Sequence, residues 1–267
     1  MEAMEHLTFE NLGCTVHYWY RKGSENKWVF FFHGAGVDHA MFEAQYGLFD
    51  ETYHILTWDA RGHGLSKLEP GTKFVFGDMI SDCKKLLERY SVKRATLIGQ
   101  SMGGNLAQEI AYQSPEPVDR MVLIDCAKNT GTLTGSEKLA LKSARFLFAL
   151  YPWKTLIRQS AEACANTEHV QNYIYDCFNR LDKQTFVTVI LNMAGSCLHE
   201  DAAYRFRQPV LLLCGVDDRL GNIRKVAGPW AEEDRNCTLH MVEHASHNSN
   251  QDNPEQVNQW ISEFLKL

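Results

Sequence analysis

Several features that would assign this chain to other protein classes are missing from its sequence. No run of eighteen apolar residues occurs in its 267 residues, so no membrane-spanning segment is expected. There is no basic cluster and the net charge is −6, which argues against a nucleic-acid-binding surface. Residues 1–10 are acidic and lack the basic and apolar segments of a secretory signal. We therefore expect a cytoplasmic protein with neither a membrane span nor a nucleic-acid partner.

A regular arrangement of cysteines is missing as well. The eight cysteines are scattered and form no Cys-x-x-Cys pair, so neither a zinc site nor a thioredoxin-like redox site is indicated. Cys126 and Cys214 lie within apolar runs, where we expect them to be small core residues. Scattered cysteines of this kind fit a reducing, cytoplasmic environment, and no cofactor is expected.

The order of the apolar runs predicts the fold class. Hydrophobic residues make up 45% of the chain and charged residues 22%, which is ordinary for a globular protein. Two short alternating runs at residues 7–10 and 15–20 predict a hairpin about Gly13. Buried strands and helices then alternate, with strands at 28–32, 55–58, 95–98 and 121–126 and helices at 39–49, 74–90 and 102–113. This alternation predicts an α/β fold with a mostly parallel sheet covered on both faces.

The alternation stops between residues 128 and 207. Only helical patterns with many large apolar residues follow there, at residues 137–151, 154–165, 169–181 and 184–198. Strand patterns resume at residues 209–214 and 238–242. We therefore expect a core formed by residues 1–127 and 208–267, with residues 128–207 inserted as a helical cap.

Residues 95–108 read ATLIGQSMGGNLAQ and place Ser101 within a Gly-x-Ser-x-Gly pattern. An apolar run ends at Gly99 and helical spacing starts after Gly103, so the pattern predicts a sharp strand-to-helix turn with the serine at its apex. Small residues are needed at both glycines because a Cβ there would collide with the neighbouring strand or helix. The helix would aim its free N–H groups and positive dipole end at an oxyanion beside Ser101. Ser101 is therefore the candidate nucleophile.

Candidate partners for this serine follow the last two predicted strands. A serine hydroxyl needs a base to take its proton, and the base needs an orienting acid. In a sheet of this type the working groups lie at the carboxyl ends of strands. One strand is followed by Asp217 and Asp218, and the next by His244 and His247. The order along the chain is therefore serine, acid, histidine.

With these residues in place, the chain resembles the α/β-hydrolase-fold enzymes that carry a helical cap, serine hydrolases of the carboxylesterase and lactonase kind. The resemblance covers almost the whole length and rests on His33-Gly34-Ala35-Gly36, residues 59–66, residues 99–104, residues 215–218, and Ser246-His247 followed by Asn253-Pro254-Glu255. It implies a mostly parallel, twisted sheet with helices on both faces and an inserted cap. The serine at position 101 disfavours the epoxide hydrolases and haloalkane dehalogenases of this fold, which use an aspartate there.

The resemblance also implies the roles of individual residues. Ser101 matches the nucleophile, His247 the general base and Asp218 the acid, which usually stands three residues after the glycine that closes the strand. Asp217 stays as an alternative acid. Asp125 is a second alternative, since some members carry the acid at the end of the preceding strand, but it can equally cap the turn into the insertion.

An oxyanion hole is implied at the backbone N–H groups of Ala35 and Met102. In this family the histidine matched by His33 usually braces the loop through hydrogen bonds.

A structural role in shaping a turn is expected for Asp59, Arg61 and His63. Ser66, in the same turn, has no nearby base and is not a rival nucleophile.

A metal site is not expected. His244 is the alternative base, and together with His240 and His247 it mimics the spacing of metal ligands. That spacing would matter on a helix, whereas His240 belongs to a predicted strand and the other two to a loop. No carboxylate or cysteine joins the set at ligand spacing.

We expect a serine hydrolase that cleaves an ester, lactone or thioester of a small, partly apolar substrate through an acyl-enzyme on Ser101. A slowly turning-over small-molecule receptor of the same fold is an alternative. A C–C hydrolase, a perhydrolase or a lyase could use the same three side chains. The sequence gives neither the substrate, whose specificity lies in the cap, nor the oligomeric state.

Overall fold

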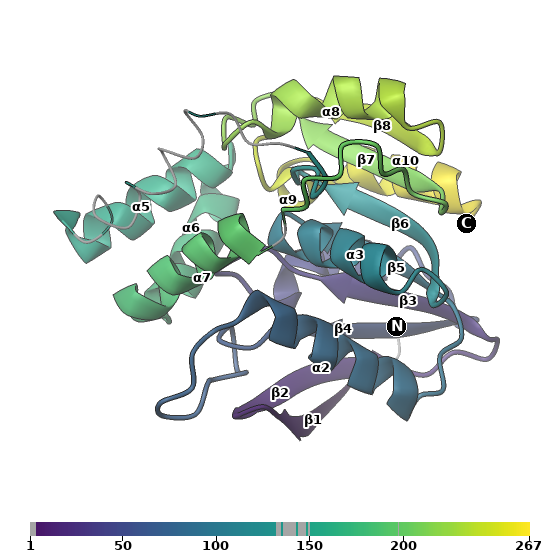
Figure 1. The fold of residues 1–267 in the computed structure, drawn as a ribbon, viewed down its shortest axis with the longest axis horizontal. Helices are drawn as coiled ribbons and strands as arrows, with labels where there is room; N and C mark the ends of the chain where they lie inside the picture. Colours follow the sequence, from purple (N-terminus) through teal and green to yellow (C-terminus); the bar gives the residue numbers. More distant parts are fainter. Residues whose placement is uncertain (1–3, 132–134, 136–142, 144–147, 149, 197) are drawn as a thin grey trace.

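The computed structural model describes residues 4–131, 135, 143, 148, 150–196 and 198–267. Within them, eight strands form one sheet in the order β1-β2-β4-β3-β5-β6-β7-β8 (Figure 1). The strands are β1 Glu5–Asn11, β2 Cys14–Arg21, β3 Lys27–Phe32, β4 Tyr53–Trp58, β5 Ala95–Gln100, β6 Val118–Ile124, β7 Val210–Gly215 and β8 Cys237–Val242. The first two strands pair antiparallel, as the predicted hairpin requires, and β2 joins β4 antiparallel. All other pairings are parallel, so the predicted mostly parallel sheet is confirmed.

The central strands β3, β5 and β7 are buried on both faces because successive side chains alternate between two layers of helices. In β3, Phe30 and Phe32 pack in one cluster, whereas Val29 and Phe31 pack in the other. The first cluster includes residues of α2 Phe76–Arg89, α3 Met102–Gln113 and α8 Ile223–Glu233. The second includes residues of η1 His39–Phe42, α1 Glu43–Tyr46 and α10 Pro254–Leu265, with α9 Ser249–Asp252 preceding α10. The sheet therefore has helices on both faces.

Three helices lie between β6 and β7 in the chain: α5 Trp153–Cys164, α6 Glu168–Asn179 and α7 Lys183–Ser196. Figure 1 shows these three helices grouped together near the carboxyl ends of β6 and β7. Trp153, Phe178 and Phe186 join them through edge-to-face ring contacts. The predicted helix at residues 137–151 falls mostly outside the described residues. No helix in the described part of the chain is long and apolar enough to cross a membrane.

Three elements differ from the sequence expectation, and one of them is the short helix α9, for which the sequence indicated no helix. The single helix expected at residues 39–49 is a 3-10 turn, η1, followed by the short helix α1. Helix α8 was not expected at all, and Pro229 lies within it. A proline removes one backbone donor and normally ends a helical pattern, which explains why the sequence did not indicate this helix.

Candidate active site

The turn between β5 and α3 holds Ser101 in a strained conformation, with φ 49° and ψ −114°. An L-residue rarely adopts a positive φ, and close packing imposes it here. A Cβ at Gly103 would lie 1.9 Å from the carbonyl oxygen of Phe32, and one at Gly99 would lie 2.3 Å from the carbonyl oxygen of Gly103. The two glycines thus let β5, α3 and β3 approach closely enough for Ser101 to stand at the apex.

Three side chains from distant parts of the sequence form one hydrogen-bonded chain. His247 Nε2 lies 2.9 Å from Ser101 Oγ, and His247 Nδ1 lies 3.0 Å from Asp218 Oδ2. A carboxylate only accepts hydrogen bonds, so Nδ1 carries the proton and Nε2 accepts from the serine hydroxyl. The side chain of Asp218 is fully buried, whereas His247 and Ser101 line a cavity. The arrangement can remove a proton from a hydroxyl that is open to a bound molecule.

The environment of His247 favours its charged form. Burial on its own would lower the pKa of the imidazole, but the hydrogen bond and the charge of Asp218 outweigh burial, and Asp125 adds to them. The pKa of His247 is therefore raised above its ordinary value. An imidazole tuned in this way accepts a proton more readily than one in water.

The two alternative carboxylates make other contacts. Asp217 accepts a hydrogen bond from Asn166 Nδ2 at 2.8 Å. Asp125 accepts from the backbone N–H groups of Gly215 and Ser249, at 2.8 and 2.9 Å. Burial, opposed by the positive field of His247, raises the pKa of Asp125 to about 7. Asp125 thus ties the end of β7 to the loop after His247, and neither alternative bonds to the imidazole.

The two residues expected to form an oxyanion hole are Ala35 and Met102. In the part of the chain that the structure describes, the amides of Ala35 and Met102 donate to no protein acceptor. Met102 is the first residue of α3, so its N–H is one of the unpaired donors at a helix N-terminus. Ala35 lines the same cavity as Ser101 and His247. Both donors are thus without a protein acceptor in the described part of the chain.

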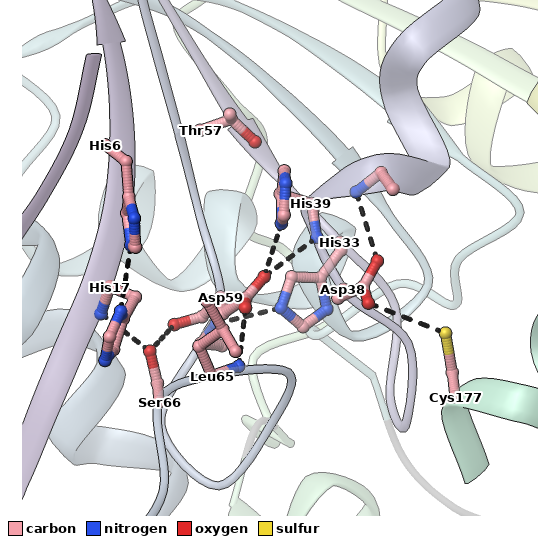
Figure 2. A network of polar contacts seen from close by, with 12 residues as sticks. His6, His17, His33, Asp38, His39, Thr57, Asp59, Leu65, Ser66 and Cys177 are labelled. Atoms are coloured by element: carbon pink, nitrogen blue, oxygen red, sulfur yellow. Dashed lines mark hydrogen bonds and ion pairs between the residues drawn. The ribbon is translucent and has the colours of Figure 1, made fainter. Parts of the chain in front are cut away.

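The loop after β3 is braced as the resemblance implies. The N–H of Ala60 donates to His33 Nε2 at 2.8 Å, which leaves His33 Nδ1 to donate to the carbonyl of Gly34 at 2.7 Å. Figure 2 shows Asp59 beside this histidine, accepting hydrogen bonds from His39 and from the N–H of Leu65. These contacts shape the backbone of the loop after β3.

The remaining residues of that turn are also structural. Arg61 forms a buried ion pair with Asp82, with Nε and Oδ2 2.7 Å apart. His63 Nδ1 lies 2.9 Å from the carbonyl oxygen of its neighbour Arg61. Ser66 Oγ donates to the carbonyl of Asp59 at 2.6 Å and accepts from the N–H of His17 (Figure 2). The hydroxyl of Ser66 is thus committed to the backbone.

Gln100 is a site residue to which the sequence assigned no role. Its side chain is buried and donates from Nε2 to the carbonyl of His247 at 2.6 Å. A Cβ at Gly34 would lie 2.1 Å from Gln100 Oε1. The residue before the nucleophile therefore fits between the loop that carries Ala35 and the loop that carries His247. Its place in Gly-Gln-Ser was the only available signal.

A cavity of about 1130 Å³ opens at Ser101 and His247. Many of its walls are apolar side chains of the inserted helices, among them Leu156, Ile174, Phe178, Phe186, Ile190 and Met193. The charged residues among its described lining are Lys128 and Lys225, and no aspartate or glutamate lines it within the described part of the chain. The volume suits a small organic molecule with a sizeable apolar part.

The three histidines whose spacing resembles that of metal ligands, His240, His244 and His247, have different surroundings. His240 stacks on Trp260, with ring centroids 3.9 Å apart, and His244 stands exposed in a loop at φ 56°. Among the described residues, the group whose ligand atoms lie within 4.8 Å of one another is Asp125, Cys214 and Asp218. Both carboxylates of this group already accept hydrogen bonds from N–H donors. Those oxygens are therefore occupied by protein donors.

Known proteins match this architecture. A sequence model of the family described as "Serine aminopeptidase, S33" matches residues 23–253. The chain is 29% identical over 140 residues to a probable serine hydrolase of Drosophila melanogaster, covering 52% of this chain and 41% of that protein, and so spans less than half of that relative's length. It is 25% identical over 248 residues to 3-oxoadipate enol-lactonase 2 of Acinetobacter baylyi, covering 89% of this chain and 88% of that one.

A solved structure shows the same fold. A thermophilic esterase from Thermogutta terrifontis superposes on this chain with a TM-score of 0.80, covering 98% of each chain at 18% identity. Identity at that level establishes the shared fold alone.

Proposed function

Because the chain belongs to the serine aminopeptidase S33 family of α/β-hydrolases, we propose that it is a serine hydrolase of carboxylic ester-type bonds. The bond would be an ester, lactone or thioester of a small, partly apolar molecule. The observation that carries this proposal is the hydrogen-bonded chain from Ser101 through His247 to Asp218 at the mouth of the cavity. Each member matches a role that acyl transfer to serine requires.

In the acylation step, His247 would take the proton of Ser101 and pass it to the leaving group. As Ser101 Oγ attacks the substrate carbonyl, Nε2 takes the serine proton, and the charge of Asp218 stabilises the imidazolium that forms. The carbonyl oxygen becomes an oxyanion that accepts from the free amides of Ala35 and Met102. His247 then returns the proton to the leaving alcohol or thiol. The products of this step are the acyl-enzyme and the alcohol or thiol, which stays attached to the acyl chain when the substrate is a lactone.

Deacylation would use the same groups with water as the nucleophile. His247 takes a proton from water, the hydroxide attacks the acyl carbon, and Ser101 Oγ leaves with the proton returned by the imidazole. The same two amides would hold the second oxyanion. The acid product would then leave the cavity.

The described cavity lining favours a substrate that has an apolar part and needs no carboxylate to bind an amine. We propose that residues 128–207 act as the cap, since α5, α6 and α7 supply many of the apolar side chains that line the cavity. An aminopeptidase must bind a free α-ammonium group, which a carboxylate in the pocket would do. The charged side chains among the described lining residues are two lysines, so this described part of the lining offers no such partner. This favours an ester-type substrate over a peptide with a free N-terminus.

The proposal is tested with a fluorophosphonate probe and a p-nitrophenyl ester. The wild-type protein should be labelled on the peptide that contains Ser101, as read by mass spectrometry, and should turn over the ester many times. Ser101→Ala should lose the label and lower kcat by about six powers of ten. Ser24→Ala, which changes an exposed serine, should behave like the wild type.

Three outcomes would contradict the proposal. A label on another serine, or turnover retained by Ser101→Ala, would show a different nucleophile. A single slow acylation without turnover would show a receptor.

A further inference from the structure

Helix α6 contacts the loop that carries Ala35 through a buried carboxylate, Asp38. The hydroxyl of Tyr173 donates to Asp38 Oδ1 at 2.9 Å, and the guanidinium of Arg180 lies 2.9 Å from Oδ2. The thiol of Cys177 also faces Oδ2, at 3.7 Å (Figure 2). Only 5% of Asp38 is exposed, and its own loop supplies one partner, the N–H of Ala40. The other three partners come from α6 and the residue that follows it, so the helix is anchored to this loop.

Packing reinforces that anchor. Gly36 has a φ of +83°, and a Cβ there would lie 2.4 Å from Cε1 of Phe178 on α6. The ring of Phe178 therefore rests directly on the backbone next to Ala35. A shift of α6 toward or away from the sheet would displace the amide that the proposed mechanism uses.

The opposite end of α6 is anchored to the loop that carries His247. Asp252 Oδ1 accepts from the backbone N–H and the hydroxyl of Thr167, at 3.0 and 2.8 Å. Its other oxygen accepts from the N–H of Asn166 at 2.9 Å and from the N–H of Ser246 at 3.0 Å. One carboxylate thus joins the residues just before α6 to the residue just before His247.

A second bond repeats this connection. On the other side of the histidine, the N–H of Asn248 donates to the carbonyl of Cys164 at 2.8 Å. Asn248 is therefore hydrogen-bonded directly to the segment that leads into α6, and Ser246 is joined to that segment through Asp252.

From these contacts we propose that α6 is a fixed brace between the oxyanion loop and the histidine loop, with Asp38 and Asp252 as its two positioning residues. The inference rests on the proposed function, since it assigns α6 a role in holding Ala35 and His247 at the correct separation from Ser101. A 12-residue helix is stiff, so anchoring both of its ends fixes the two loops relative to each other. Acyl transfer is sensitive to such placement, because an error of about 1 Å can cost about 100-fold in rate.

Three variants test the brace with p-nitrophenyl acetate and a fluorophosphonate. Tyr173→Phe removes one hydroxyl at the Asp38 end, and Asp252→Asn replaces one of two accepting oxygens by a donor at the other end. Asp176→Asn is the matched control, an exposed carboxylate on the same helix. The two end variants should lower the acylation rate and the rate of phosphonate labelling by about 10- to 100-fold, with KM for this short ester nearly unchanged. The control should match the wild type.

A purely structural role for α6 would give a different result. Thermal unfolding and circular dichroism identify any variant that fails to fold. Thr167→Val, which loses only a hydroxyl at the Asp252 end, then replaces Asp252→Asn. Folded variants that acylate at the wild-type rate, or that change only KM, would overturn the brace. Absence of labelling at Ser101 in the wild type would instead overturn the proposed function, so the two failures are distinguishable.

Discussion

The three candidate carboxylates for the partner of His247 make different contacts in the structure. Asp218 meets Nδ1 of the imidazole, while Asp217 bonds to Asn166 and Asp125 bonds to two backbone amides. These contacts give each carboxylate a separate consequence on mutation. The first two predictions follow from them.

Asp218→Asn should lower kcat by about 10⁴-fold, because an amide no longer holds the imidazole in the required tautomer or stabilises the imidazolium. Asp125→Asn should keep kcat within about tenfold of the wild type. It should cost about 1–3 kcal/mol in the free energy of unfolding, since Gly215 or Ser249 loses its acceptor. Ester kinetics and urea unfolding of both variants measure this. A larger loss of kcat in Asp125→Asn than in Asp218→Asn would reverse the assignment.

Under the proposed function, the raised pKa of His247 should set the pH dependence of activity. The general base must be neutral, so kcat/KM should rise with pH through the pKa of the free enzyme's imidazole. Because Asp218 raises that pKa, the midpoint of this limb should lie above about 6.5, the ordinary value for histidine. In Asp218→Asn the rise of kcat/KM with pH should have its midpoint at a lower pH. The measurement is kcat/KM for a p-nitrophenyl ester from pH 5 to 9, and a midpoint that does not move in the variant contradicts the assigned cause.

At the scale of elements, the turn between β5 and α3 has no space for another atom at Gly103. Gly103→Ala should destabilise the fold by more than about 3 kcal/mol, because its Cβ would overlap the backbone of β3. Gly77→Ala is the matched control, since nothing lies within 4 Å of a Cβ at that helical position. The control should be neutral or stabilising by about 0.5 kcal/mol. Urea unfolding of both variants measures the difference, and a mild effect at Gly103 would show that the strands can separate there.

At the scale of the whole molecule, buried neutral histidines make the fold sensitive to acid. Burial lowers the pKa of His63 to about 3 and lowers the pKa of His33 as well. Between pH 6.5 and the lower folded pKa, the unfolded chain binds protons that the folded chain does not. Stability therefore falls as pH drops through this window, by about 1.4 kcal/mol per pH unit for each such histidine.

His63→Phe tests this sign directly. The variant loses the hydrogen bond to the carbonyl of Arg61, so its stability at pH 7 should be lower. Its free energy of unfolding should nevertheless fall less steeply between pH 6.5 and 4 than that of the wild type. Urea midpoints at several pH values give the two slopes. Equal slopes would show that His63 does not cause the acid sensitivity.

The sequence by itself determined the strands, the hairpin, the parallel sheet and the turn at Ser101, because these depend on local patterns. Apolar runs specify buried strands wherever they are placed, and glycines on either side of one serine specify a tight turn. Helix α8 escaped detection because Pro229 interrupts its pattern, although the surrounding structure accommodates the proline. Tertiary structure overrode the local signal at that element.

The family resemblance favoured Asp218 as the partner of His247, but residue patterns alone left Asp217 and Asp125 open, and only the tertiary structure shows which carboxylate meets the imidazole and what anchors α6. Asp217 and Asp218 are adjacent in the sequence, and the path of the chain after β7 determines which of them faces the imidazole. Asp38 and Tyr173 are 135 positions apart, and neither lies in a sequence motif that predicts their contact. Contacts between distant segments depend on how complete layers of helices settle on the sheet, and no local run of residues encodes that.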